Sequence, residues 1–102
     1  MRGRHADAMR AYRQLTTVSP TNPEGWFGVA QMALVAHQAT EARDAARRAE
    51  ALYLTAGSPL VEDARLLLGF AAIALADWPT VRATLEPQYA KLADDAEVNL
   101  AL

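Results

Sequence analysis

The sequence contains no cysteine, and this absence excludes several kinds of chemistry at once. Without a thiol there is no disulfide framework, no thiolate nucleophile and no zinc site built on cysteine ligands. Aromatic residues make up only 7% of the 102 positions, and glycine and proline occur five times each. β-branched residues are also scarce, whereas alanine, which costs least in a helix interior, is abundant. This composition predicts an all-α chain.

Neither sign of charge dominates, since the net charge is −2 and the arginines alternate with acidic residues. A nucleic-acid-binding surface needs a basic stripe that displaces counterions, so we expect no nucleic-acid partner. The longest apolar run, residues 66–76, falls short of the roughly 18 residues needed to span a bilayer, so we expect no membrane insertion. No signal-peptide pattern opens the chain, and the cellular location stays unknown.

Small and apolar residues recur with helical spacing on either side of a short break at residues 37–40. The two sets, each following an i, i+3, i+4, i+7 pattern, are Trp26, Val29, Ala30 and Ala33, then Ala42, Ala45, Ala46 and Ala49. Alanine on both facing stripes allows two antiparallel helices to approach closely. This stretch therefore predicts a helical hairpin.

The pattern recurs along the chain. Ala8 stands 34 residues before Ala42, Tyr12 follows Ala8 by four, and Pro20 follows Tyr12 by eight. A later stretch contains a Leu68-Gly69 pair, followed by Asp77-Trp78 at the next expected turn. Together these residues resemble the tetratricopeptide repeat, a helix–turn–helix of about 34 residues with an early Trp, a Leu-Gly pair, a later Ala and a closing Pro.

The resemblance implies one domain over residues 1–102, a short α-solenoid of antiparallel helical hairpins with about six helical segments. Its units are a half-repeat at 3–18, repeats at 23–56 and 59–92, and a partial repeat at 95–102. Half-repeats at both ends indicate either a fragment of a longer array or an unusual start that something else covers. Pro87 predicts a kink or break at Glu86, with the helix resuming at 88–92.

Local signals predict several helix starts and packing positions. Asn22 is the expected N-cap of a helix that Pro23 opens, and Ser58 is the expected N-cap of a helix that Pro59 opens. Trp26 and Trp78 occupy positions that the repeat uses for packing, which favours a core role over an exposed stacking platform. His37 stands where the family usually has glycine.

The other face of the first helix of each repeat is the candidate partner site. In proteins of the resembled family these positions line a concave groove that holds a peptide or a partner helix. In this sequence they are Glu24, Phe27, Gln31, Leu34 and Val35 in one repeat, and Asp63, Leu66, Phe70, Ile73 and Ala74 in the next. The Lys and Asn that clamp a terminal carboxylate in some family members are absent there, so the expected groove is apolar.

No motif for catalysis, cofactor binding or metal binding is visible. His5 and His37 lack a marked third ligand or an orienting carboxylate, and the acids at 94, 95 and 97 fit a helix start better than a calcium loop. No Gly-rich phosphate loop, nucleophile elbow or paired-carboxylate motif occurs. We therefore expect no enzyme, no cofactor and no metal.

Two functions remain open at this stage. The first is a protein–protein interaction scaffold that binds a segment of another protein in the apolar groove. The second is a structural or self-associating element whose groove packs against the rest of a larger protein or another copy. In the first case Phe27, Leu34, Phe70 and Ile73 form the partner site, and in the second they are core residues that neighbouring helices cover.

Overall fold

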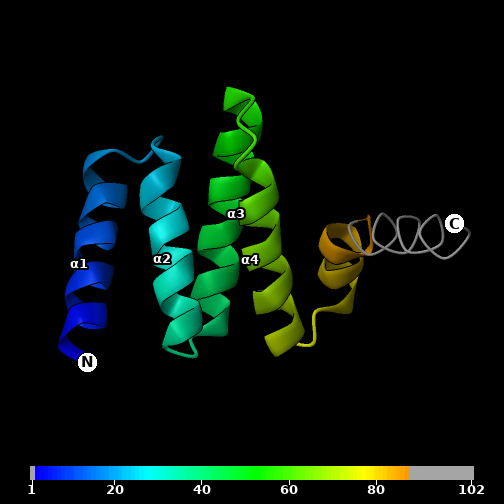
Figure 1. Ribbon diagram of the computed structural model, residues 1–102, viewed down its shortest axis with the longest axis horizontal. Helices are drawn as coiled ribbons and strands as arrows, with labels where there is room; N and C mark the ends of the chain where they lie inside the picture. The colour runs from blue at the N-terminus through cyan, green and yellow to red at the C-terminus, as the bar shows by residue number, and fades with distance from the viewer. Residues whose placement is uncertain (1, 88–102) are drawn as a thin grey trace, which may run out of the picture.

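The computed structural model describes residues 2–87, and these residues are helical with no strand. The helices are α1 (Arg2–Val18), α2 (Pro23–Val35), α3 (Ala39–Ala56) and α4 (Val61–Ala74), followed by a fifth helical segment at residues 78–87 (Figure 1). The prediction of an all-α chain is confirmed. Of the about six segments predicted, five are described, and the partial repeat at 95–102 lies outside the described residues.

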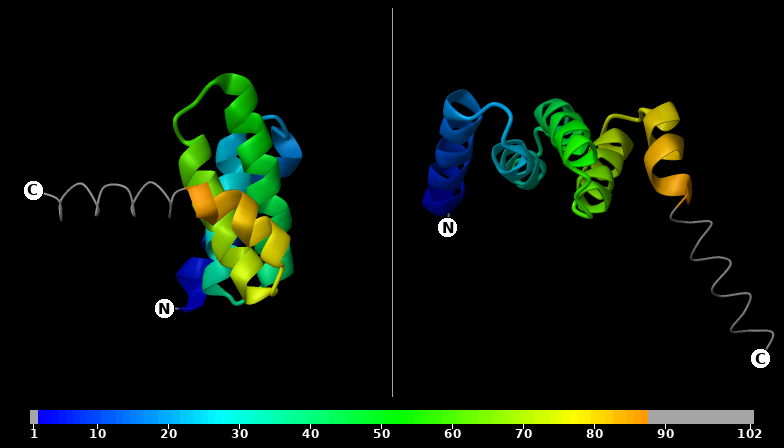
Figure 2. Two further views of the ribbon diagram at one scale, coloured as in Figure 1. Left: turned by 90° about the vertical axis from the view of Figure 1, so that its right-hand side faces the viewer. Right: turned by 90° about the horizontal axis from the view of Figure 1, so that it is seen from above.

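The helices α1 to α4 lie side by side in chain order, and each runs antiparallel to the one before it (Figure 1). Seen from above, α2 and α4 lie on one side of the row and α3 on the other (Figure 2). Accordingly α2 contacts α1, α3 and α4. The segment 78–87 runs across the direction of α3 and α4 rather than along it (Figure 2). One side of the molecule is therefore built from α2 and α4.

Alanine dominates the interface between α2, α3 and α4. The buried core consists of nine alanines with four larger residues: Met9, Val29, Ala30, Ala33, Ala42, Ala45, Ala46, Ala49, Tyr53, Ala64, Leu68, Ala71 and Ala72. Both predicted alanine stripes are in this core. Small side chains on facing helices allow the backbones to approach closely, which is the physical reason that these sequences pack as hairpins.

Two glycines permit further close approaches between helices. A Cβ atom at Gly28 of α2 would overlap the ring of Tyr12 from α1, and one at Gly69 of α4 would lie 2.6 Å from two side-chain carbons of Leu85. The aromatic ring of Tyr12 thus lies directly on the α2 backbone. Packing of this kind joins α1 to α2 and the segment 78–87 to α4.

The start of α2 is as predicted, and the start of α4 is not. Asn22 caps α2, because its side-chain oxygen accepts a hydrogen bond of 3.0 Å from the Glu24 N–H. Ser58 was predicted to cap a helix opened by Pro59, but α4 begins at Val61. The Ser58 hydroxyl instead accepts from the Leu60 N–H at 3.1 Å, and its carbonyl accepts from the Val61 N–H at 3.2 Å. This tighter turn delays the regular α-helical pattern by two residues.

The helices α2, α3 and α4 each end in the same type of turn, in which a residue just after the helix has a positive φ. The residues in that position are Gly57 (φ 67°), His37 (φ 60°) and Ala76 (φ 55°). After α2, for example, the Gln38 N–H donates to the Ala33 carbonyl at 2.8 Å and the His37 N–H donates to the Leu34 carbonyl at 3.1 Å. This is the Schellman arrangement, which normally uses glycine because a Cβ atom disfavours positive φ.

The two tryptophans differ in how far they are buried. Trp26 packs against the core, its Nε1 donates to the Pro20 carbonyl at 2.8 Å, and the Arg48 guanidinium lies 5.6 Å from its ring centroid. Trp78 is 55% exposed, so the prediction that it packs in the core is wrong. It occupies the first position of the segment 78–87, which reaches α4 through Leu85 instead.

Pro87 does not break the helix that contains it at the predicted place. Residues 78–87 are continuously helical through Glu86 to Pro87, the last described residue. Proline removes one backbone donor, but its own φ is helical, so the preceding turn can remain intact. The predicted continuation at 88–92 lies outside the described residues.

Candidate partner-binding face

The ten residues predicted for the partner site all lie on α2 or α4, and none of them is buried. We call this set the α2–α4 face; it comprises Glu24, Phe27, Gln31, Leu34, Val35, Asp63, Leu66, Phe70, Ile73 and Ala74. The two helices contact each other and occupy the same side of the molecule (Figure 2). That the face is concave stays a prediction.

Three large apolar side chains on this face are about half exposed to water. The exposed fractions are 52% for Val35, 53% for Phe70 and 46% for Ile73. Single exposed apolar side chains are ordinary on protein surfaces, whereas several on one face are typical of interaction sites. The α2–α4 face therefore contains apolar surface that the described residues leave uncovered.

Two other members of the face also pack inward. Leu34 is partly buried against the main alanine core, and Phe27 is partly buried against Ala49, Tyr53 and Ala64. The rings of Phe27 and Tyr53 meet edge to face, with centroids 6.1 Å apart and an interplanar angle of 74°. Such contacts fix the ring orientation, so Phe27 supports the face and contributes to it.

Acidic residues mark one end of the face. Glu24 lies in the first turn of α2 and Asp63 in the first turn of α4, and these two helices begin at the same end of the molecule (Figure 1). Burial raises the pKa of the Tyr53 hydroxyl, and the negative charges of Glu24 and Asp63 raise this pKa further. The two carboxylates, from different helices, are thus close enough to Tyr53 to act on the same hydroxyl.

Tyr53 is the residue of this region that the sequence reasoning missed. Its side chain is only 5% exposed, and within the described residues its hydroxyl makes no hydrogen bond. Tyr53 follows Ala49 by four, so it extends the buried stripe of α3 by one more turn. The signal that could have identified it is this bulky polar-tipped residue at the end of a stripe of alanines.

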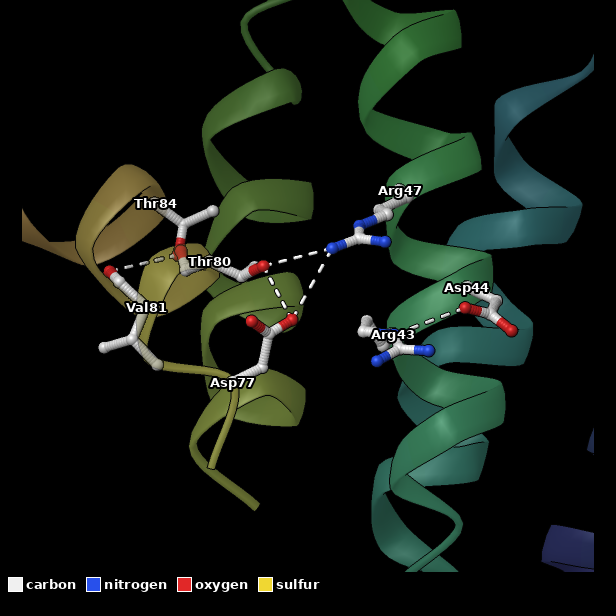
Figure 3. A network of polar contacts seen from close by, with 7 residues as sticks. All are labelled: Arg43, Asp44, Arg47, Asp77, Thr80, Val81 and Thr84. Carbon is white, nitrogen blue, oxygen red and sulfur yellow. Dashed lines mark hydrogen bonds and ion pairs between the residues drawn. The ribbon is translucent and has the colours of Figure 1, made fainter. Parts of the chain in front are cut away.

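Arginines of α1 and α3 form ion pairs and hydrogen bonds with other residues of the chain. Arg13 of α1 donates two hydrogen bonds to the Glu41 carboxylate of α3, at 2.6 and 2.9 Å. Arg47 lies 3.6 Å from the Asp77 carboxylate and donates to the Thr80 hydroxyl at 3.0 Å (Figure 3). These contacts join α3 to helices on both sides of it.

Asp77 anchors the start of the last described helical segment. The Thr80 hydroxyl donates to its carboxylate at 2.7 Å, and Arg47 approaches the same oxygen (Figure 3). These groups hold the pKa of the Asp77 carboxyl below its usual value, with the Thr80 hydroxyl as the largest cause and the arginines as smaller ones. The arrangement is structural, since it fixes the segment 78–87 to α3.

A hollow of about 800 Å³ lies between α1 and α2 and includes one member of the α2–α4 face. It is lined by His5 and His37, by Met9 and Met32, and by Val35 of that face. Across residues 2–87, however, no three His, Cys, Asp or Glu side chains gather closely enough to hold a metal ion. Within the same range, every helix is too short or too polar to cross a membrane.

Comparisons with protein-family models, with curated proteins and with solved structures find no match for this chain. The functional argument therefore depends on the geometry and chemistry of the α2–α4 face.

Proposed function

We propose that this chain is a protein–protein interaction scaffold built as a short tetratricopeptide-like α-solenoid, which binds an extended or helical segment of another protein on the α2–α4 face. The 34-residue offset between Ala8 and Ala42 supports the repeat, as do the alanine stripes and the placement of α2 and α4 on one side of the row. In such an arrangement the first helices of successive repeats present neighbouring strips of one continuous surface.

The observation that carries the proposal is the exposure of Phe70, Ile73 and Val35 on two adjacent helices. Burying an apolar side chain of this size is worth about 1.5–3 kcal/mol, so a partner that covered all three would gain appreciable binding energy. Recognition of an apolar segment by a helical surface is a recurring mode of peptide binding. The face offers such a surface without the basic groups that a carboxylate ligand would need.

A structural, self-associating role is the second candidate. The observation that favours it is that large apolar side chains are also exposed outside the α2–α4 face, namely Val18, Leu54, Leu60 and Trp78. A surface with uncovered apolar groups in several places suits a repeat that packs against further protein. In this role the α2–α4 face would be covered by another copy or by other parts of a larger protein.

Sedimentation velocity over a wide concentration range, followed by selection from a random peptide library displayed on phage, separates the two candidates. The scaffold is expected to sediment as a monomer and to enrich peptides rich in apolar residues. The double substitution Phe70→Ala/Ile73→Ala should abolish this enrichment. The control Val18→Ala/Leu54→Ala removes equally exposed apolar groups elsewhere and should leave the enrichment unchanged.

Association that depends on concentration and is lost in Phe70→Ala/Ile73→Ala would support the structural role instead. A monomer that enriches the same peptides before and after that substitution would contradict the proposed binding face.

A further inference from the structure

Both histidines of the chain and two of its three methionines line the same hollow between α1 and α2. His5 and Met9 come from α1, Met32 comes from α2, and His37 comes from the turn that follows α2. The two histidines stand 32 positions apart in the sequence. The fold therefore collects two imidazoles and two thioethers, all of them metal ligands, around one cavity of about 800 Å³.

The pairing of α1 with α2 brings these residues to one level of the molecule. The two helices run antiparallel, so the start of α1 lies beside the end of α2 (Figure 1). The ring of Tyr12 lies against the backbone of Gly28, which fixes how the helices are aligned. About one turn further towards this end, α1 presents Met9 and α2 presents Met32, and one more turn along α1 reaches His5.

The four side chains differ in their exposure to water. Met9 is only 8% exposed, and Met32 is partly buried against the core that contains Met9. His5 and His37 are exposed, and within residues 2–87 neither imidazole has a hydrogen-bond or ion-pair partner. An ion that enters the hollow from solvent therefore meets imidazoles near the surface and thioethers nearer the core.

Methionine in a core has an ordinary explanation, because its flexible side chain fills irregular gaps. This accounts for Met9 and Met32 by themselves. It does not account for the two exposed histidines on the same hollow. The sequence marked no third ligand for these histidines, and the fold supplies two.

The chemistry of the four donors selects the ion. Soft thioether ligands select copper(I), and imidazole also suits copper. Zinc takes thiolate, imidazole and carboxylate ligands, and calcium and magnesium take oxygen ligands, whereas no carboxylate or thiolate lines the hollow. We propose that His5, Met9, Met32 and His37 bind copper(I), for which silver(I) is a redox-stable substitute. This inference goes beyond the proposed function and does not depend on it.

Two arginines also line the hollow, and an unpaired positive charge there would disfavour any cation. Each of them is close to an acid, however: Arg10 lies 3.6 Å from Asp7, and Arg13 lies 2.6 Å from Glu41. These carboxylates offset much of the positive charge. What remains repels a monovalent ion half as strongly as a divalent one, since Coulomb energy is proportional to charge. The arginines thus favour copper(I) over divalent metals.

The first test measures copper(I) affinity without oxygen, by competition with the chromophoric copper(I) chelator bicinchoninate. The natural chain should remove a single equivalent of copper(I) from the chelator. His37→Gly should weaken this binding about tenfold or more, which is the smallest effect expected when even an indirect partner of a metal ligand is removed. Loss of binding cannot come from unfolding, because residue 37 has φ 60° and glycine should stabilise this turn.

The matched control is Ala76→Gly. It makes the same kind of backbone change at the turn after α4, where φ is 55°, and residue 76 does not line the hollow. Copper(I) affinity of this variant should equal that of the natural chain. An equal loss of affinity in Ala76→Gly and His37→Gly would overturn the site.

The second test observes the thioethers without any substitution. In a chain with ¹³C-labelled methionine methyl groups, one equivalent of silver nitrate should shift the NMR signals of Met9 and Met32. The same amount of zinc chloride should shift neither signal, because thioethers are poor ligands for zinc. The variants Met9→Leu and Met32→Leu, which nearly conserve volume, assign the two signals and should each weaken copper(I) binding about tenfold or more.

Three results would overturn the proposal. The first is a natural chain that removes no copper(I) from bicinchoninate. The second is copper(I) binding that stays unchanged in His37→Gly and in both leucine variants. The third is a silver-induced shift confined to the methyl group of Met1, which would place the ion at the chain terminus. None of these results bears on the scaffold, because peptide selection on the α2–α4 face tests it separately.

Discussion

The helices α1 and α3 differ from α2 and α4 in how many arginines they carry and in how these arginines are paired. The α1 and α3 helices carry most of the described arginines, namely Arg2, Arg4, Arg10, Arg13, Arg43, Arg47 and Arg48. Several of these pair with acids inside the chain, as Arg13 does with Glu41. On the other side α2 has no basic residue, and the single arginine of α4 is engaged by Glu50 and Glu62.

This difference concerns charge alone. The polar contacts of α1 and α3 join neighbouring helices, although each of these helices also exposes a large apolar side chain, Val18 on α1 and Leu54 on α3. The α2–α4 face has half-exposed apolar side chains and no basic residue, and it is the surface that the proposed function assigns to a partner.

The largest expected effect distinguishes Phe27, which packs inward, from Phe70, which is half exposed. Phe27→Ala should lower the free energy of unfolding by about 1.5–3 kcal/mol, less than the full cost for a wholly buried phenylalanine, because Phe27 is partly buried against Tyr53. Phe70→Ala should cost about 1 kcal/mol or less, because this ring is 53% exposed. Urea denaturation of both variants measures the difference, and equal costs would show that Phe70 is a core residue.

The alanine layer provides the next comparison. Ala49→Leu should destabilise the chain by roughly 1–3 kcal/mol, because Ala49 is 0% exposed and the larger side chain would force the helices apart. The matched control Ala51→Leu, two residues away on the exposed surface of α3, should be nearly neutral. If the two variants shared one denaturation midpoint, the close approach of α2 and α3 would be wrong.

Smaller effects are expected at the turns that end α2 and α4. His37→Gly and Ala76→Gly should each raise the free energy of unfolding by about 0.5–1 kcal/mol, because glycine adopts the left-handed conformation without a steric cost. At the equivalent turn after α3, Gly57→Ala should have the opposite sign. Thermal melts of the three variants check these signs, and stabilisation by Gly57→Ala would contradict the geometry of that turn.

The smallest effect concerns pH and the charge-paired side of the molecule. Because the folded state lowers the pKa of Asp77 below the usual 3.8, this carboxylate contributes stability that is fully present above pH 3.8 and is lost as pH falls through the lower folded value. Asp77→Asn should therefore reduce the thermal midpoint slightly at pH 7, and the reduction should shrink as the pH falls below 3.8. A reduction that stayed constant across this range would exclude the charge as its cause.

Much of the fold could be predicted because it depends on local spacing. The alanines between Ala30 and Ala49 identify both helices of the central hairpin, and Asn22 followed by Pro23 identifies where that hairpin begins. Periodicity of this kind needs only neighbours in sequence. The ten residues of the α2–α4 face lie on α2 and α4 as predicted, and none of them is fully buried, although Phe27 and Leu34 pack partly against the core.

What the sequence could not predict depends on how separate elements meet. The edge-to-face contact between Phe27 of α2 and Tyr53 of α3 joins residues 26 positions apart, and no local pattern encodes it. The exposure of Trp78 follows from the direction of the segment 78–87, which repeat spacing alone does not determine (Figure 2). The late start of α4 similarly depends on hydrogen bonds in the Ser58 turn rather than on the identity of a capping residue.

The alanine core has a consequence for how this chain tolerates mutation. Nine of its thirteen buried apolar residues are alanines, and a side chain of one carbon can lose almost nothing. Every substitution at these positions except glycine therefore adds atoms, so overpacking rather than cavity formation is the usual cause of destabilisation. In a complete scan of single substitutions, glycine and serine should be the least harmful replacements along the two stripes, and the bulky hydrophobic residues that most cores accept should be among the worst.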